Sequence, residues 1–161
     1  MKPGLKIHRE ENEMDDTRLG KLYQQMAETV IEMIPEEWEK VYLYGEVADG
    51  FSKSFFFYYP SERREPVYSL DIPELFHVSE EKFAELKHQL LDELEELWTE
   101  YQSQGHEPWT NLTFILDNSG KFKIDFDYTD LSGANPHQQQ IIWEYQYLRL
   151  VPEDEDDRAF L

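Results

Sequence analysis

The chain has 161 residues, of which 35 are Asp or Glu and 15 are Lys or Arg, giving a formal net charge of −20 at pH 7. Aromatic residues make up 15% of the chain and the wider hydrophobic set 40%, which excludes an acidic disordered chain because such chains are poor in aromatic residues. The absence of cysteine excludes a disulfide framework, a thiol nucleophile and a thiolate metal site.

The length suits one domain, and no Gly/Ser-rich or Pro-rich linker divides the sequence. Residues 1–14 are polar and lack an apolar period, so we expect a flexible N-terminal arm there and a single domain over residues 15–161. The opening residues lack the apolar run of a signal peptide, which predicts a cytoplasmic protein.

A first helix is predicted to begin at Asp15 or Asp16, either of which can cap it, and to end before Pro35. Its apolar residues recur at steps of three and four: Leu19, Leu22, Met26, Val30 and Met33. Such a stripe needs a sheet to cover.

Three strands are predicted next. Apolar and polar residues alternate over residues 40–47, Asp49-Gly50 indicates a hairpin turn, and a second strand over residues 54–59 ends at Pro60. A third, shorter strand is expected over residues 66–70, and Pro73 closes this meander. The alternation leaves four aromatic side chains opposite the expected core, where helix cover and partner contact are equally good interpretations: Tyr42, Tyr44, Phe56 and Tyr58.

The second helix has the clearest signals, because Ser79 is a good N-cap and Gly105 can terminate the helix. Its apolar stripe consists of Phe83, Leu86, Leu90, Leu94, Leu97 and Tyr101. At roughly 1.5 to 3 kcal/mol for each fully buried large apolar side chain, the stripe could supply on the order of 10 kcal/mol before entropy is subtracted. The apolar stripe of this helix must therefore pack against another part of the protein.

A second hairpin is predicted from strands over residues 109–117 and 121–128, joined by a turn at residues 118–120. Residues 138–150 look helical, and an acidic run follows over residues 153–157. The predicted fold is therefore α+β, with an antiparallel sheet of about five strands and three helices in the order α-β-β-β-α-β-β-α.

Signatures of catalysis are absent from the sequence. Its five histidines are scattered without metal-site spacing, and no nucleophile elbow, phosphate-binding glycine loop or HExxH motif is present. The best enzyme candidate is a divalent-cation site formed by Asp125, Asp127 and Asp130, since alternate strand residues share a face. The competing interpretation is an ordinary solvated strand face, on which Lys121 and Lys123 offset the charge.

Two further acidic surfaces are candidates for binding a basic partner. The long helix carries carboxylates opposite its apolar stripe, at Glu81, Glu85, Asp92, Glu96 and Glu100. Carboxylates one turn apart lie about 5 to 6 Å from each other and loosely resemble a phosphate row. The tail adds Glu153, Asp154, Glu155, Asp156 and Asp157. For both surfaces, simple solvation is the ordinary alternative.

Several ordered blocks of sequence, covering roughly residues 20–161, resemble the YezG-like immunity protein family of Gram-positive bacteria. They are LY at residues 22–23, IPEEWEKVYLY at 34–44, YSLDIP at 68–73, WTNLT at 109–113, GKFKID at 120–125, IIWEY at 141–145 and PEDED at 152–156. These blocks identify the family without naming contact residues.

The resemblance implies a non-enzymatic cytoplasmic antitoxin that silences the nuclease domain of an LXG-type polymorphic toxin exported by type VII secretion. Such a protein needs no cofactor or metal, and its partner is a basic protein and not a nucleic acid or a membrane. On charge and exposure alone, we expect partner contacts from Asp125, Asp127 and Asp130, from residues 153–157, and from Asp92 on the long helix. A metal-dependent hydrolase and an acidic scaffold for another basic protein remain the alternatives.

Overall fold

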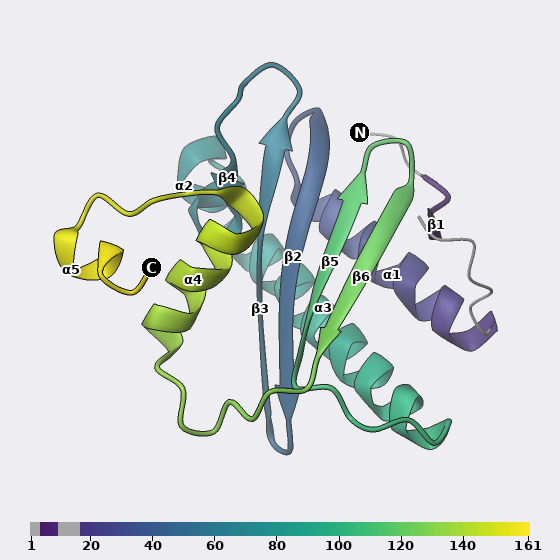
Figure 1. The fold of residues 1–161 in the computed structure, drawn as a ribbon. Coiled ribbons are helices and arrows are strands. Elements are labelled where there is room, and N and C mark those ends of the chain that lie inside the picture. Colours follow the sequence, from purple (N-terminus) through teal and green to yellow (C-terminus); the bar gives the residue numbers. More distant parts are fainter. Residues whose placement is uncertain (1–3, 10–16) are drawn as a thin grey trace. The chain divides into compact units, whose positions relative to one another are not determined.

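A computed structural model describes residues 4–9 and 17–161 of the chain (Figure 1). The chain forms two compact units, Met1–Tyr128 and Thr129–Leu161, which are described separately. The division of the chain into an arm and one domain over residues 15–161 stays a prediction. Within the described part of the chain, no helix combines the length and the apolar content that a membrane span requires.

The first unit is built on a six-stranded mixed sheet, which confirms the predicted α+β class. The strands are β1 (His8–Arg9), β2 (Trp38–Ala48), β3 (Phe51–Pro60), β4 (Val67–Tyr68), β5 (Asn111–Asp117) and β6 (Lys121–Asp127). Their order in the sheet is β1-β6-β5-β2-β3-β4, and every neighbouring pair is antiparallel except β1 with β6. The two predicted hairpins are therefore joined through β2 and β5.

Two long helices, α1 (Thr17–Met33) and α3 (Glu80–Ser103), pack against each other and cover one face of this sheet (Figure 1). The five apolar residues predicted for α1 are all buried, as are the stripe residues of α3 from Phe83 to Leu97. Ser79 caps α3 by accepting a hydrogen bond from the Lys82 N–H at 3.1 Å, which confirms the predicted cap. The proposed Asp15 and Asp16 caps of α1 lie outside the described residues.

The prediction for the aromatic residues of β3 was wrong by one position. Phe56 and Tyr58 belong to the core under the helices, because they pair with the core residues Leu43 and Val41 of β2. Phe55 and Phe57 share the opposite face with Tyr44, and all three are buried. The two-residue turn sets this register: it pairs Ala48 with Phe51, and directly paired residues of an antiparallel ladder share a face.

Several short elements were not predicted. β1 lies within the segment expected to be a flexible arm, and its two residues pair with Lys121 and Phe122 of β6. The expected third strand shortens to Val67–Tyr68 and continues as a 3-10 turn (η1, Ser69–Asp71) and the helix α2 (Ile72–Phe76). Pro73 lies in the first turn of α2, where its missing N–H costs no hydrogen bond.

The second unit contains two helices, α4 (Pro136–Leu148) and α5 (Glu155–Arg158). α4 confirms the predicted last helix but starts two residues earlier, because Asn135 accepts a hydrogen bond from the Gln138 N–H at 3.0 Å and caps it. α5 turns the acidic run into a short helix that the sequence analysis did not predict.

Gly45 of β2 tests how tightly α3 packs on the sheet. A Cβ at this position would lie 2.7 Å from Leu94 Cδ2, so the fully buried Leu94 side chain would have to shift within the core. We therefore expect Gly45→Ala to lower the free energy of unfolding by about 1 to 3 kcal/mol, measured by urea titration. Gly20→Ala in α1 is the matched control, since nothing lies within 4 Å of its Cβ and stability should stay equal or rise by up to about 1 kcal/mol. Equal losses in both variants would contradict this account.

Candidate partner-binding surface

A groove of about 750 Å³ runs between α1 and α3. α1 contributes Arg18, Lys21, Leu22 and Gln25 to its lining, and α3 contributes Asp92, Glu95, Glu96, Thr99 and Glu100. Four carboxylates therefore face two cationic side chains. We call this surface the acidic groove.

Three of the five carboxylates predicted on α3 lie in the acidic groove, namely Asp92, Glu96 and Glu100. They are spaced four residues apart, so each is one turn and about 6 Å further along the helix. Glu81 and Glu85 are exposed near the start of α3 and do not line the groove. Glu95 was missed by the sequence analysis, although its spacing of three residues from Asp92 is a signal that could have identified it.

Contacts to neighbouring elements hold two of the groove carboxylates in place. Arg18 Nε lies 3.3 Å from Glu100 Oε1, and the Glu100 side chain is only 13% exposed. Ser52 of β3 donates a hydrogen bond from Oγ to Glu95 Oε2 at 2.6 Å. The groove therefore presents two held carboxylates, Glu95 and Glu100, on a packed helix, with the exposed Asp92 and Glu96 beside them.

Glu93 of α3 lies where α3 contacts α1. Its Oε2 accepts hydrogen bonds from Thr29 Oγ1 at 3.0 Å and from Gln89 Nε2 at 3.3 Å. Its Oε1 is buried and has no hydrogen-bond partner among the described residues. Burial raises the pKa of Glu93 above its usual value, and the neighbouring carboxylates Glu96 and Glu28 add to this effect.

Asp125 and Asp127 lie on β6, on the sheet face opposite α1 and α3. Glu46 of β2 joins Asp127 there, because Glu46, Asn111 and Asp127 pair directly across three strands. Asn111 Nδ2 donates to Asp127 Oδ2 at 3.2 Å, and Lys123 Nζ lies 3.8 Å from Asp125 Oδ1. Glu46 could not be assigned to this group before the pairing of β2 with β5 was known.

Asp130 belongs to the second unit, separate from Asp125 and Asp127 in the first. Its Oδ1 accepts a hydrogen bond from the Ser132 N–H at 3.0 Å, which holds the pKa of Asp130 below its usual value. Within residues 4–9 and 17–161, no group of three or more His, Asp or Glu side chains is arranged to hold a metal ion. The metal-site interpretation of the three aspartates therefore gains no support from the geometry of the described residues.

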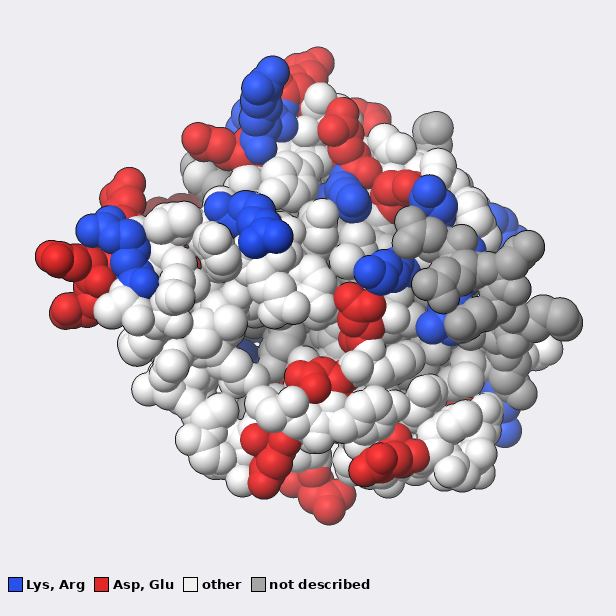
Figure 2. Space-filling model, in the orientation of Figure 1, with Lys and Arg blue, Asp and Glu red and all other residues white. Residues whose placement is uncertain are grey.

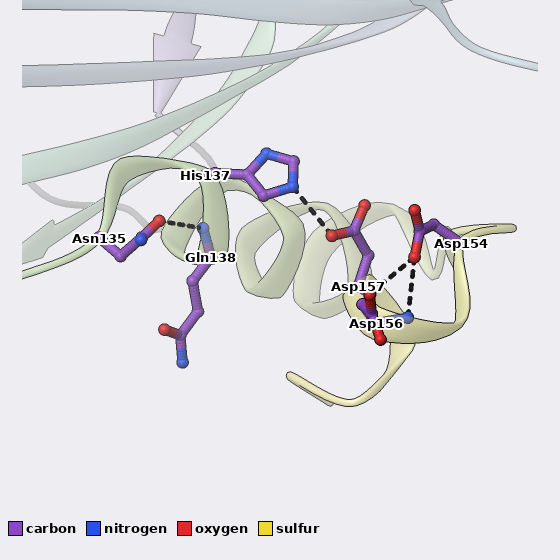
Figure 3. A network of polar contacts seen from close by, with 6 residues as sticks. All are labelled: Asn135, His137, Gln138, Asp154, Asp156 and Asp157. Atoms are coloured by element: carbon purple, nitrogen blue, oxygen red, sulfur yellow. Dashed lines mark hydrogen bonds and ion pairs between the residues drawn. The ribbon is translucent and has the colours of Figure 1, made fainter.

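The acidic tail is partly engaged in its own folding, as Figure 3 shows. Asp154 caps α5 by accepting hydrogen bonds from the N–H groups of Asp156 at 2.8 Å and Asp157 at 3.4 Å. Asp157 Oδ1 lies 2.9 Å from His137 Nε2 in the first turn of α4. Glu153, Glu155 and Asp156 have exposed side chains, so these three are the tail residues best placed to meet a partner.

The distribution of charge differs between surfaces. In the view of Figure 2, Asp and Glu side chains are scattered and Lys and Arg side chains stand among them. The acidic groove, by contrast, gathers four carboxylates along one helix. With Arg18 and Lys21 on its other side, this row of carboxylates is a candidate surface for a basic partner.

Comparisons with known proteins agree on one family. A family model described as immunity protein YezG-like matches residues 19–161. The chain is 43% identical over 150 residues to the immunity protein YezG of Bacillus spizizenii, covering 92% of this chain and 93% of that protein. It is 41% identical over 142 residues to the immunity protein YezG of Bacillus subtilis, covering 87% of this chain and 94% of that protein. The type VII secretion system protein EsaG of Staphylococcus aureus is 32% identical over 142 residues, which is 87% of each chain.

The buried carboxyl group of Glu93 allows a test of the contact between α1 and α3. A carboxyl group whose pKa is raised by folding stabilises the fold below its unfolded pKa, and this contribution is lost as the pH rises through the folded pKa. Glu93→Gln keeps an acceptor for Thr29 and removes the charge. We therefore expect its melting temperature to exceed that of the wild type by a few degrees, on the order expected for a change near 1 kcal/mol, at pH 7 to 8.

The difference between Glu93→Gln and the wild type should shrink as the pH falls toward 4.5, the ordinary pKa of a Glu side chain. Thermal unfolding followed by circular dichroism from pH 4 to pH 8 measures this trend. Glu85→Gln, which removes an exposed carboxylate from the same helix, is the matched control. A melting temperature of Glu93→Gln below the wild type at pH 8 would contradict the assignment.

Proposed function

The chain belongs to the YezG-like immunity protein family, and on this premise we propose that it is an antitoxin that binds and inhibits the nuclease domain of a cognate toxin exported by type VII secretion. An immunity protein has a cognate toxin as its partner, and membership in this family agrees with the prediction of a non-enzymatic protein. The name of the Staphylococcus aureus relative supports the link to type VII secretion. The proposal places the protein in the cytoplasm of the cell that makes the toxin.

The acidic groove is the observation that supports a nuclease as the target. A nuclease presents a basic surface to the phosphates of its substrate, so a groove of fixed carboxylates is complementary to it. The formal charge of −20 adds a long-range attraction that steers the two proteins together. Rapid capture suits an antitoxin, because a nuclease left free before export could cut the DNA of the cell that makes it.

We assign different roles to the predicted contact residues. Asp92, Glu95 and Glu96 in the acidic groove are proposed to contact the toxin directly. Asp125, Asp127 and Asp130, with the exposed tail residues Glu153, Glu155 and Asp156, are proposed to contribute attraction at longer range. Their charges are exposed or are engaged by nearby hydrogen-bond donors, so each one adds little affinity alone.

Inhibition is tested by mixing the purified chain with the nuclease domain encoded by the neighbouring toxin gene and following DNA cleavage. We expect cleavage to stop at a one-to-one ratio, with no change in the DNA when the chain is present alone. Undiminished cleavage in spite of complex formation would favour a scaffold for a basic protein. Failure to form a complex with any nuclease domain would reject the proposal.

Two matched triple variants test the role of the acidic groove. The groove variant carries Asp92→Asn, Glu95→Gln and Glu96→Gln, and the tail variant carries Glu153→Gln, Glu155→Gln and Asp156→Asn. Both change the net charge by the same three units. We expect the groove variant to lower the association rate with the toxin about tenfold at low salt and to speed dissociation, measured by surface plasmon resonance. The tail variant should affect only the association rate, and equal dissociation rates in the two variants would move the interface elsewhere.

A further inference from the structure

The segment Gly4–Arg9, here called the strap, lies along the outer edge of the sheet. His8 N donates to the Gly120 carbonyl oxygen at 2.8 Å, and His8 and Arg9 pair with Lys121 and Phe122 of β6. Leu5 and Ile7 pack against the core. The strap thus covers the start of β6, which is otherwise the last strand at this end of the sheet.

One side chain of α1 holds the strap. Gln24 accepts a hydrogen bond from the Ile7 N–H at 3.1 Å and donates one to the Leu5 carbonyl oxygen at 2.7 Å. The approach of the strap to the sheet is close, since a Cβ at Gly120 would overlap the Lys6 carbonyl group. The matching family model begins at residue 19, so the strap lies outside the part of the chain that defines the family.

The backbone N–H and C=O groups of alternate β6 residues point away from β5, toward the outer edge of the sheet. The hydrogen bond from His8 to the Gly120 carbonyl shows that even-numbered residues present their backbone groups to the outer edge at this end. In a regular strand Phe122, Ile124 and Phe126 share that direction. An added strand would therefore bond to these three residues.

The charged side chains of β6 are placed symmetrically about Ile124, with Lys on one side and Asp on the other. Its sequence over residues 121–127 is KFKIDFD, with Lys121, Lys123, Asp125 and Asp127 on one face and apolar residues between them. If two copies of β6 run antiparallel about Ile124, Lys121 faces Asp127 of the second copy and Lys123 faces Asp125. Phe122 then lies opposite Phe126, and all outward backbone groups can form hydrogen bonds.

We propose that β6 is a latent dimerisation edge, whose start the strap covers at Lys121 and Phe122, and that it pairs antiparallel with β6 of a second copy of this chain when the strap is displaced. The paired sheets would be related by a twofold axis through Ile124. Covering an edge strand with another segment is a common protection against such pairing. This inference is independent of the proposed antitoxin function.

The charges select one register among those that the backbone permits. A shift of two residues in one direction places Lys123 opposite Lys123, and a shift in the other places Asp125 opposite Asp125. Like charges directly opposite each other destabilise a strand pair. A shift of one residue turns the backbone groups of one strand away from the other. The register centred on Ile124 is therefore the one in which every charged side chain faces an opposite charge.

The full chain with Gln24→Ala tests the first half of the proposal, because this change removes both hydrogen bonds between the Gln24 side chain and the strap. We expect a concentration-dependent rise in molar mass from 19.4 kDa toward twice that value, measured by sedimentation and light scattering. The wild type and Gln25→Ala, an exposed neighbour on α1, should stay monomeric over the same range. A variant lacking residues 1–9 provides a second release of the strap. Monomers for both released variants at every accessible concentration would overturn the proposal.

A charge swap tests whether β6 itself forms the interface. In the Gln24→Ala background, Lys123→Asp puts a new carboxylate opposite Asp125 of the other copy. The twofold axis repeats this repulsive pair, so dimerisation should weaken about tenfold. Adding Asp125→Lys restores opposite charges in both pairs and should restore the dimer. The amides of Phe122, Ile124 and Phe126 should gain protection from hydrogen exchange on dimerisation. A dimer that is insensitive to the single change, or that the double change does not restore, would place the interface elsewhere and reject β6.

Discussion

The packing of α3 on the inner face of the sheet is the constraint on which the first unit depends. Leu90, Leu94 and Leu97 are buried against the sheet, and Leu94 fits over Gly45 because that residue has no side chain. A helix held this closely cannot rotate about its axis. The face of the helix that carries the carboxylates is therefore set by how the apolar stripe is buried, and the acidic groove follows from it.

The excess of negative charge is tolerated because few of the described carboxylates are buried without compensation. Glu100 lies beside Arg18, Asp127 accepts a hydrogen bond from Asn111, and Asp154 caps a helix. Glu93 is the exception, since part of its carboxyl group is buried without a partner in the described chain and its pKa is raised. Repulsion among the remaining carboxylates costs stability, and a protein that must meet a basic partner quickly gains association rate from the same charges.

Local signals predicted those elements that depend on local chemistry. Ser79 and Gly105 bracket α3 because a cap and a left-handed residue act within one turn of the helix. The face of the β3 aromatic residues was predicted wrongly, although the two-residue turn at Asp49-Gly50 already fixes the pairing of Tyr44 with Phe55. Counting back from the turn gives the correct face, whereas alternation within β3 cannot, because five aromatic residues follow one another over residues 55–59.

The sequence by itself determined the α+β class, the two long helices, both hairpins, the family and the surplus of negative charge, because periodicity, caps, turns and composition are properties of neighbouring residues. Only the tertiary structure decided that β2 pairs with β5, that the strap joins β6, and that Glu95 lines a groove with Arg18 while Asp130 belongs to a different unit from Asp125 and Asp127. These features depend on contacts between residues far apart in the chain, where the free energy of packing and strand pairing selects among arrangements that local patterns leave equal.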